Sequence, residues 1–277
     1  AYDETGEEKY RNAIEHIMDQ LRKQPRTQEG NFWHKNIYPN QVWLDGLYMG
    51  QVFYMMYESR FGGKEHYSDI IKQFKLVRRN MFNDEKQLYY HAYDESRQMY
   101  WADKTTGLSQ NFWLRSMGWY LLALIECLDA IDQSVYEYYD DLKSLFKEAL
   151  KGVLKYQDEK THLFYQVIDR ADVKENYLET SGSAMIAYAM LKACRMKAVL
   201  AEKYEDNAIS IFEALADNKL EEVDGELKLG GICSVAGLGG KEKRDGSLKY
   251  YFSEPVVYDD HKGVGPFIMA YSEINRL

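Results

Sequence analysis

The amino-acid sequence predicts an all-α protein built from repeated pairs of helices, as in a helical toroid or solenoid. The chain has only four prolines, and none falls between Pro39 and Pro255. A β-sandwich or barrel of this length would spend more proline on its turns. Hydrophobic residues make up 45% of the 277 residues, which is enough to bury a large core. The third observation is a two-helix unit that recurs along the chain.

The first helix of each unit is amphipathic, as expected for a helix on the outside of the molecule. In the third unit Leu142, Phe146, Leu150 and Val153 recur at helical spacing, with lysines and acidic residues between them. The four outer helices are expected at residues 8–24, 66–82, 138–157 and 200–220.

A short turn-rich stretch follows each outer helix, and a more apolar helix then closes the unit. Two of these stretches contain aromatic strings, at 88–91 and 162–165, that favour short strands. Between Met185 and Met190 almost every position is apolar or small, which is typical of a helix buried on several sides. The inner helices are expected at residues 42–57, 112–130, 180–196 and 264–274.

The glycine-rich segment 230–260 is the one long stretch outside this pattern, and we expect it to form an extended loop. The sequence shows no linker and no abrupt change of composition. It therefore predicts a single domain over residues 1–277.

Charge and cysteine content limit the function classes. The net charge of −9 argues against nucleic acids and anionic membranes as partners, and no apolar run is long enough to span a bilayer. The three cysteines have no paired spacing, and no histidine pair has zinc-ligand spacing, so we predict no disulfide, no metal and no cofactor. Buried thiols, and first residues unlike a secretory signal, predict a cytoplasmic protein.

Most of the unusual side chains lie just before or at the start of the inner helices. If those helices are parallel, their amino ends meet at one rim, where backbone donors and helix dipoles favour an anion. Aromatic faces that stack on a ring, and cations that pair with a carboxylate, would suit a sugar acid there. The rim residues are His34, Lys35, Trp43, Asp45, Gly46, His91, Asp94, Trp101, Asp103, Trp113, Arg115, Trp119, Glu179–Ser181 and Asp259–Gly263.

Each of these residues also has a purely structural interpretation. Asp45 alone is more often a carboxylate that favours a helix start, and Asp103 is more often a turn residue. His91 and the tryptophans, taken singly, more often belong to the core, and Glu179 can simply cap a helix. Arg115 is more telling, because a buried guanidinium needs a partner.

Seven strings, in order along nearly the whole chain, resemble glycoside hydrolase family 105. They are GNFWHK (30–35), YPNQVWLDGLYMG (38–50), YHAYDE (90–95), WAD (101–103), FWLRSMGWY (112–120), ETSGS (179–183) and GVGPF (263–267). That family comprises unsaturated rhamnogalacturonyl hydrolases and related unsaturated glucuronyl hydrolases. The resemblance implies a toroid of six helical hairpins, of which the sequence contains four.

The missing part would be about two hairpins at the amino end, together with a second active-site aspartate of the family. Such a gap would expose apolar surface of the inner helices. We therefore expect self-association through the incomplete ring.

The reaction that the resemblance implies begins on a terminal uronic acid with a double bond between C4 and C5, left by a polysaccharide lyase. An acid protonates the double bond, water adds at C5, and the hemiketal opens and releases the next sugar. One carboxyl group can act as acid and then as base, so it should have a raised pKa in a partly dry pocket. The resemblance assigns this role to Asp45, with Asp103 as second choice.

Other site residues follow from the same resemblance. His91 would orient the substrate or the acid. Trp43, Trp113 and Trp119 would form the sugar platform, and the uronate carboxylate would be bound by candidates that include His34, Arg115 and Lys262. The expected partner is an unsaturated uronic-acid oligosaccharide such as the unsaturated rhamnogalacturonan disaccharide. The sequence leaves galacturonate and glucuronate both open.

Two alternatives remain at this stage. One is ordinary inverting hydrolysis by Asp45 and Asp103, which needs roughly 6.5–9.5 Å between the two carboxyl groups. The other is a helical-repeat protein without activity that binds carbohydrate or acts as a scaffold.

Overall fold

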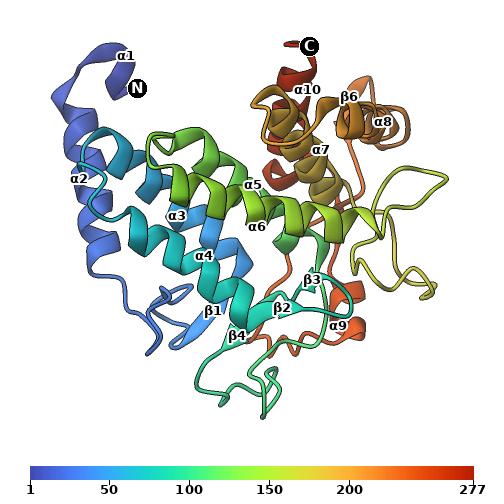
Figure 1. Cartoon of the computed structure of the whole chain (residues 1–277). Helices are drawn as coiled ribbons and strands as arrows, with labels where there is room; N and C mark the ends of the chain where they lie inside the picture. Colours follow the sequence, from blue (N-terminus) through green and yellow to red (C-terminus); the bar gives the residue numbers. More distant parts are fainter.

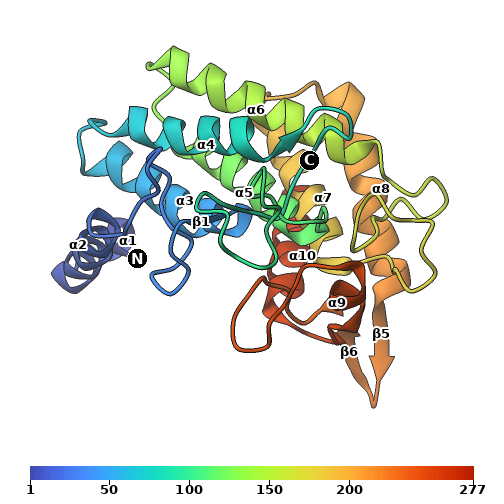
Figure 2. The same ribbon diagram turned by 90° about the horizontal axis from the view of Figure 1, so that it is seen from below.

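The computed structural model describes residues 1–277, and its main elements are eight long helices (Figure 1). The outer helices are α2 (Glu8–Arg22), α4 (Tyr67–Met81), α6 (Tyr136–Leu154) and α8 (Ala201–Lys219). The inner helices are α3 (Leu44–Arg60), α5 (Leu114–Ala130), α7 (Thr180–Arg195) and α10 (His261–Ile274). Inner helices pack in chain order, α3 on α5, α5 on α7 and α7 on α10, and Figure 2 shows the outer helices following an arc around them.

The remaining elements are short. Two small helices are α1 (Tyr2–Thr5) and α9 (Leu248–Ser253). Eight strands form four antiparallel pairs, β1 with β4, β2 with β3, β5 with β6 and β7 with β8. Their bounds are β1 Gln41–Trp43, β2 Phe82–Asn83, β3 Leu88–Tyr89, β4 Ala92–Asp94, β5 Leu220–Val223, β6 Glu226–Leu229, β7 Ile232–Cys233 and β8 Val256–Val257.

Burial explains the difference between the two sets of helices. Every residue of α7 from Thr180 to Cys194 is buried, whereas α2 buries only Met18. The inner helices supply half of a hydrophobic core of 52 buried residues. Apolar residues on all sides therefore direct a helix to the centre, and an amphipathic stripe directs one to the outside.

The structure confirms the eight predicted long helices, with small shifts at their ends. Helix α3 begins at Leu44 because residues 41–43 form β1, and α10 begins at His261 because the side chain of Asp260 caps it. The expected loop at 230–260 is wrong in part, since it contains β7, β8 and α9, and α9 is capped by Ser247. The string at 162–165 forms only an isolated bridge between Tyr165 and Leu178.

The structure is mostly helical, and the four hairpins are present. A six-hairpin ring stays a prediction. None of the ten helices combines the length and the apolar character that crossing a bilayer requires. The pair β1–β4 and helix α9 gather at the lower side of Figure 1, where α3 begins, and the candidate site lies there.

Candidate active site

A strand pair places an acid beside an imidazole at the amino end of α3. Trp43 of β1 pairs with Ala92 of β4, and the amide of Leu44 donates a hydrogen bond of 3.2 Å to the carbonyl of His91. The first turn of α3 then directs Asp45 at the ring of His91, with 3.4 Å between Oδ2 and Nε2. The His91 side chain is fully buried, whereas 16% of the Asp45 side chain is exposed.

Two opposing influences set the pKa of Asp45. Burial is the largest single influence and raises the pKa, because it disfavours the charged carboxylate. The polar contact with His91 is the largest influence in the opposite direction, and together with the smaller electrostatic influences of His91 and His34 it holds the pKa below its ordinary value. The raised pKa expected from the sequence is therefore wrong for the ligand-free protein.

Aromatic rings surround this pair. His34 stacks on Trp43 with ring centres 4.4 Å apart, and Tyr38 stacks on the same tryptophan at 5.3 Å. Burial, partly opposed by the charge of Asp45, lowers the pKa of His34 to about 4, so its imidazole is uncharged at neutral pH. Gly46 lies close to this ring, since a Cβ at that position would be 3.1 Å from Nδ1 of His34, a tight contact.

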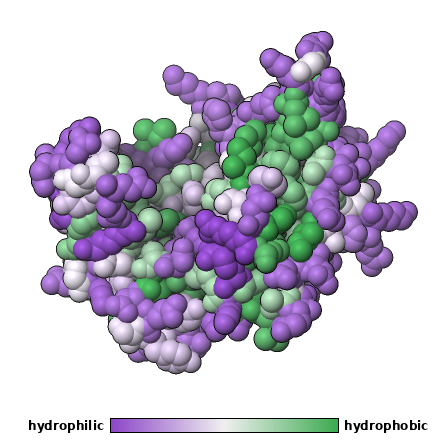
Figure 3. All heavy atoms as spheres, turned by 90° about the horizontal axis from the view of Figure 1, so that it is seen from above, coloured by the Kyte–Doolittle hydropathy of each residue, from purple (hydrophilic) through white to green (hydrophobic).

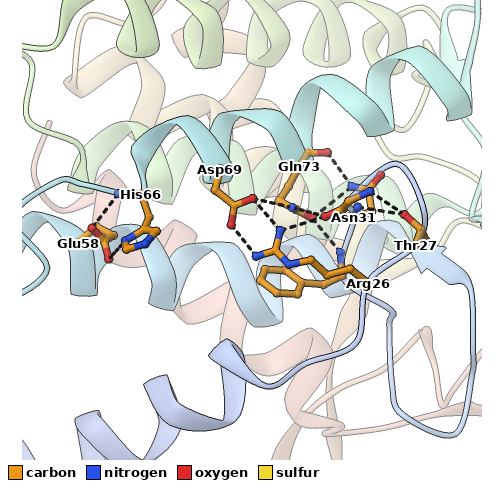
Figure 4. A network of polar contacts seen from close by, with 9 residues as sticks. Arg26, Thr27, Asn31, Glu58, His66, Asp69 and Gln73 are labelled. Atoms are coloured by element: carbon orange, nitrogen blue, oxygen red, sulfur yellow. Dashed lines mark hydrogen bonds and ion pairs between the residues drawn. The ribbon is translucent and has the colours of Figure 1, made fainter.

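A polar network holds the segment that leads to His34 against α4 (Figure 4). Arg26 forms a two-pronged ion pair with Asp69, at 2.6 and 2.7 Å. The side-chain amide of Asn31 donates to the backbone carbonyl of Gln73 at 3.2 Å, and the side-chain carbonyl of Gln73 accepts from the amide of Phe32 at 3.0 Å. These contacts fix the chain two residues before His34.

The guanidinium of Arg115 is enclosed beside the candidate site. It donates to the carbonyl of Cys233 at 2.5 Å and to the hydroxyl of Ser181 at 3.2 Å, and only 1% of the residue is exposed. The side chain of Glu179 accepts hydrogen bonds from the backbone amides of Gly182 and Cys233. It therefore caps α7, which is the structural role that the sequence left open for it. Arg115 therefore ties the segment at β7 to α5 and α7.

Of the three tryptophans expected to stack on a sugar, two are buried and one is accessible. Trp43 is 5% exposed and Trp113 is 1% exposed. Trp119 is partly buried and lies one turn beyond Arg115 on α5, with its ring 4.7 Å from that of Tyr48. Tyr48 lies one turn beyond Asp45 on α3, so this pair continues the site along the inner helices.

Two of the predicted residues, Asp103 and Lys262, already have polar partners in this structure. Asp103 is exposed and accepts three hydrogen bonds within its own turn, from the amides of Thr105 and Thr106 and from the Thr106 hydroxyl. The hydrogen bonds from Thr106 hold the pKa of Asp103 below its ordinary value, and the bond from its backbone amide has the largest effect. Lys262, in the first turn of α10, forms an ion pair of 2.7 Å with Asp260.

A cavity of about 550 Å³ lies along α3, within the usual size range of small-molecule sites. Its walls combine apolar, aromatic and polar side chains and include His34, Trp43 and Gly46, but neither Asp45 nor His91 lines it. The cavity is also lined by Trp33, Met49 and Gln51. The structure has no group of three or more His, Cys, Asp or Glu side chains arranged to hold a metal ion.

Tyr251 also belongs to the site, although the sequence did not predict it. Its hydroxyl lies 2.7 Å from Nδ1 of His91, although the two residues are 160 positions apart. It comes from α9, inside the segment expected to be a loop, and no motif marks it. Only the three-dimensional structure reveals this contact.

Comparisons with known proteins agree with this architecture. The family model for Glycosyl Hydrolase Family 88 matches residues 1–277. A solved glycoside hydrolase of family 105 from Clostridium acetobutylicum (C. acetobutylicum ATCC 824) superposes with a TM-score of 0.96 at 44% identity, covering 100% of this chain and 76% of that one.

Two sequence relatives extend the comparison. Protein Atu3128 of Agrobacterium fabrum is 38% identical over 232 residues, which cover 81% of this chain and 97% of that protein. The unsaturated rhamnogalacturonyl hydrolase YesR of Bacillus subtilis is 27% identical over 198 residues, covering 69% of this chain and 54% of that protein. The resemblance to family 105 is confirmed, and the match over its whole length shows that the chain belongs to glycosyl hydrolase family 88.

Proposed function

We propose that this protein removes the terminal 4,5-unsaturated uronic acid from short oligosaccharides made by polysaccharide lyases, with Asp45 as proton donor. The observation that carries the proposal is the placement of Asp45. Its Oδ2 faces the buried His91, while the rest of the side chain is partly open to solvent beside aromatic rings. The similarity to YesR, named an unsaturated rhamnogalacturonyl hydrolase, supports an unsaturated galacturonyl group as the substrate.

The proposed reaction needs one carboxyl group in two roles. Protonated Asp45 transfers its proton to C4 of the double bond, and the positive charge develops at C5. Water adds at C5 and gives a proton back to the Asp45 carboxylate. The resulting hemiketal opens to a ketone at C5, and the aldehyde forms at C1 as the next sugar leaves with its glycosidic oxygen.

Substrate binding supplies the protonated form of Asp45. In the ligand-free protein the pKa of Asp45 lies below its ordinary value, so the side chain is ionised at neutral pH. The substrate brings a second carboxylate and excludes water, and both changes raise the pKa of a neighbouring acid. His34, uncharged at neutral pH, would contact the substrate as a hydrogen-bonding group rather than as a cation.

The structure favours this reaction over ordinary inverting hydrolysis. Inversion would use Asp103 as the second carboxylate, but its side chain is engaged in three hydrogen bonds inside an exposed turn. Asp103 therefore holds its own turn together, and we assign it no step in the reaction.

The test is an activity assay on unsaturated rhamnogalacturonan and glucuronan disaccharides, with loss of the ultraviolet absorbance of the double bond as readout. We expect Asp45→Asn to lower kcat by about a thousandfold, within the range for a lost general acid. Asp103→Asn is the matched control and should keep kcat within about threefold, because its loss affects only a turn. Full activity of Asp45→Asn would exclude Asp45 as the acid.

We also infer that the chain self-associates through apolar inner-helix surface. Met49 and Met56 on α3 are 59% and 40% exposed, and Ile268 and Tyr271 on α10 are 58% and 53% exposed. Figure 3 shows several groups of apolar residues, with hydrophilic residues between them, on the face seen from above. Large exposed apolar patches are typical of interaction sites.

A further inference from the structure

His91 is held between two partners and has no contact with solvent. Its residue is 0% exposed, its Nε2 lies 3.4 Å from Oδ2 of Asp45, and its Nδ1 lies 2.7 Å from the hydroxyl of Tyr251. Trp43 and Trp113 flank the ring, with centres at 5.3 and 4.7 Å. A buried histidine with two partners can adopt only the tautomers that those partners accept.

The hydroxyl of Tyr251 has one partner to which it can donate a hydrogen bond, His91. The residue is 0% exposed, and its side chain makes no hydrogen bond other than the one to His91. Burial raises the pKa of Tyr251 well above its ordinary value, so the phenol keeps its proton. A buried hydroxyl that donates to nothing is costly, so the bond to His91 favours the phenol as donor and Nδ1 as acceptor.

We propose that Tyr251 is a positioning residue that fixes the ring proton of His91 on Nε2 and directs it at Asp45. With Nδ1 occupied as an acceptor, the one N–H of the imidazole lies at Nε2, which faces Oδ2 of Asp45. That oxygen is buried and, like Nε2 of His91, has no hydrogen bond in this structure, so the exposed part of the Asp45 side chain does not include Oδ2. Tyr251 therefore determines, through His91, which carboxylate oxygen is left for the substrate.

The surroundings of Tyr251 hold its ring in place independently of the hydroxyl. Helix α9 is capped by Ser247, and the backbone carbonyl of Tyr251 accepts a hydrogen bond of 3.0 Å from the side chain of Gln166. The ring also stacks near Trp113 at 6.3 Å. Tyr251→Phe thus removes the hydroxyl and keeps the packing, which makes it a clean variant.

The first arm of the test is ¹⁵N NMR of the protein labelled in its six histidines, with the His91 signals assigned from a His91→Gln variant. We expect wild-type His91 to carry its proton on Nε2 and to show a hydrogen-bonded acceptor at Nδ1. Tyr251→Phe should change the Nδ1 signal of His91 and leave the other five histidines unchanged. Tyr258→Phe, which removes the hydroxyl of an exposed tyrosine bound to Glu221, is the matched control and should change none.

The second arm rests on the proposed function and measures kinetics on the unsaturated disaccharides. Tyr251→Phe should lower kcat about tenfold, the equivalent of one hydrogen bond, with KM changed less than about twofold. In the His91→Gln background the same substitution should have no further effect, because Tyr251 acts through His91.

The two arms separate the possible failures. Inactivity of the wild type on every unsaturated substrate would reject the proposed function, whereas the NMR arm would still decide the tautomer. A proton on Nδ1 of wild-type His91, or an equal loss of kcat in both backgrounds, would overturn the positioning role of Tyr251.

Discussion

At the scale of single residues, the chemistry depends on how Asp45 shares its environment with His91. Burial raises the pKa of Asp45, but His91 and His34 outweigh it, so the acid is ionised until the substrate arrives. The sequence marks Asp45 through the string WLDG, and it marks His91 through YHAYDE. It could not predict the balance of these opposing effects, because that balance depends on a contact between segments 46 positions apart.

This balance predicts different pH dependences for the two kinetic constants. The alkaline limb of kcat/KM reports Asp45 in the free protein, and that of kcat reports Asp45 in the complex. Because the substrate carboxylate raises the pKa of Asp45, the kcat limb should lie at higher pH, by about one unit or more. The check is a pH series on the unsaturated disaccharide, and limbs at the same pH would contradict the role of Asp45.

Tyr251 and Asp103 show where residue-level prediction fails. Asp103 follows the buried Trp101 by two positions, but its carboxylate accepts hydrogen bonds within its own turn. The threonine-glycine sequence that follows is typical of such a turn. Tyr251 is one of 24 tyrosines, and only the folding of the segment 230–260 brings it to His91. Sequence motifs identify the site residues that lie within them. The other site residues are brought to the site by long-range packing and can be identified only from the structure.

At the scale of the elements, the helices could be predicted because apolar periodicity reports burial directly. Helix α7 is apolar or small on nearly every face and is buried throughout. The short strands could not be predicted reliably, since β3 and the string at 162–165 have similar sequences but only β3 finds a pairing partner, β2. Whether another segment pairs with such a string decides the outcome, and for β3 that segment is the nearby β2.

Close packing of α5 against α7 gives a prediction at this scale. A Cβ at Gly182 would lie 2.4 Å from Cγ of Leu114, so Gly182→Ala must push the amino ends of the two helices apart. We expect a loss of about 1–3 kcal/mol in the free energy of unfolding. Gly265→Ala is the control, because nothing lies within 4 Å of its Cβ position in α10, and it should gain up to about 1 kcal/mol.

Thermal or denaturant unfolding of both variants provides the measurement. If Gly182→Ala were as stable as the wild type, the two helices would not be as closely packed as the structure shows.

At the scale of the whole molecule, the four hairpins leave apolar side chains of α3 and α10 exposed. We expect the sedimentation coefficient to rise with protein concentration. Ile268→Glu should reduce this rise, because it places a charge in the apolar surface of α10. Leu227→Glu is the control, since Leu227 is 70% exposed on the β5–β6 hairpin. A wild-type chain that stays monomeric at every concentration would contradict self-association.

The most direct test of the proposed reaction follows the unsaturated rhamnogalacturonan disaccharide by proton NMR during turnover. Hydration predicts that the vinylic proton at C4 disappears as the next sugar is released, and that no free unsaturated uronic acid accumulates. Asp45→Asn should abolish both changes. Accumulation of free unsaturated uronic acid with its vinylic proton intact would show ordinary hydrolysis and contradict the proposed chemistry.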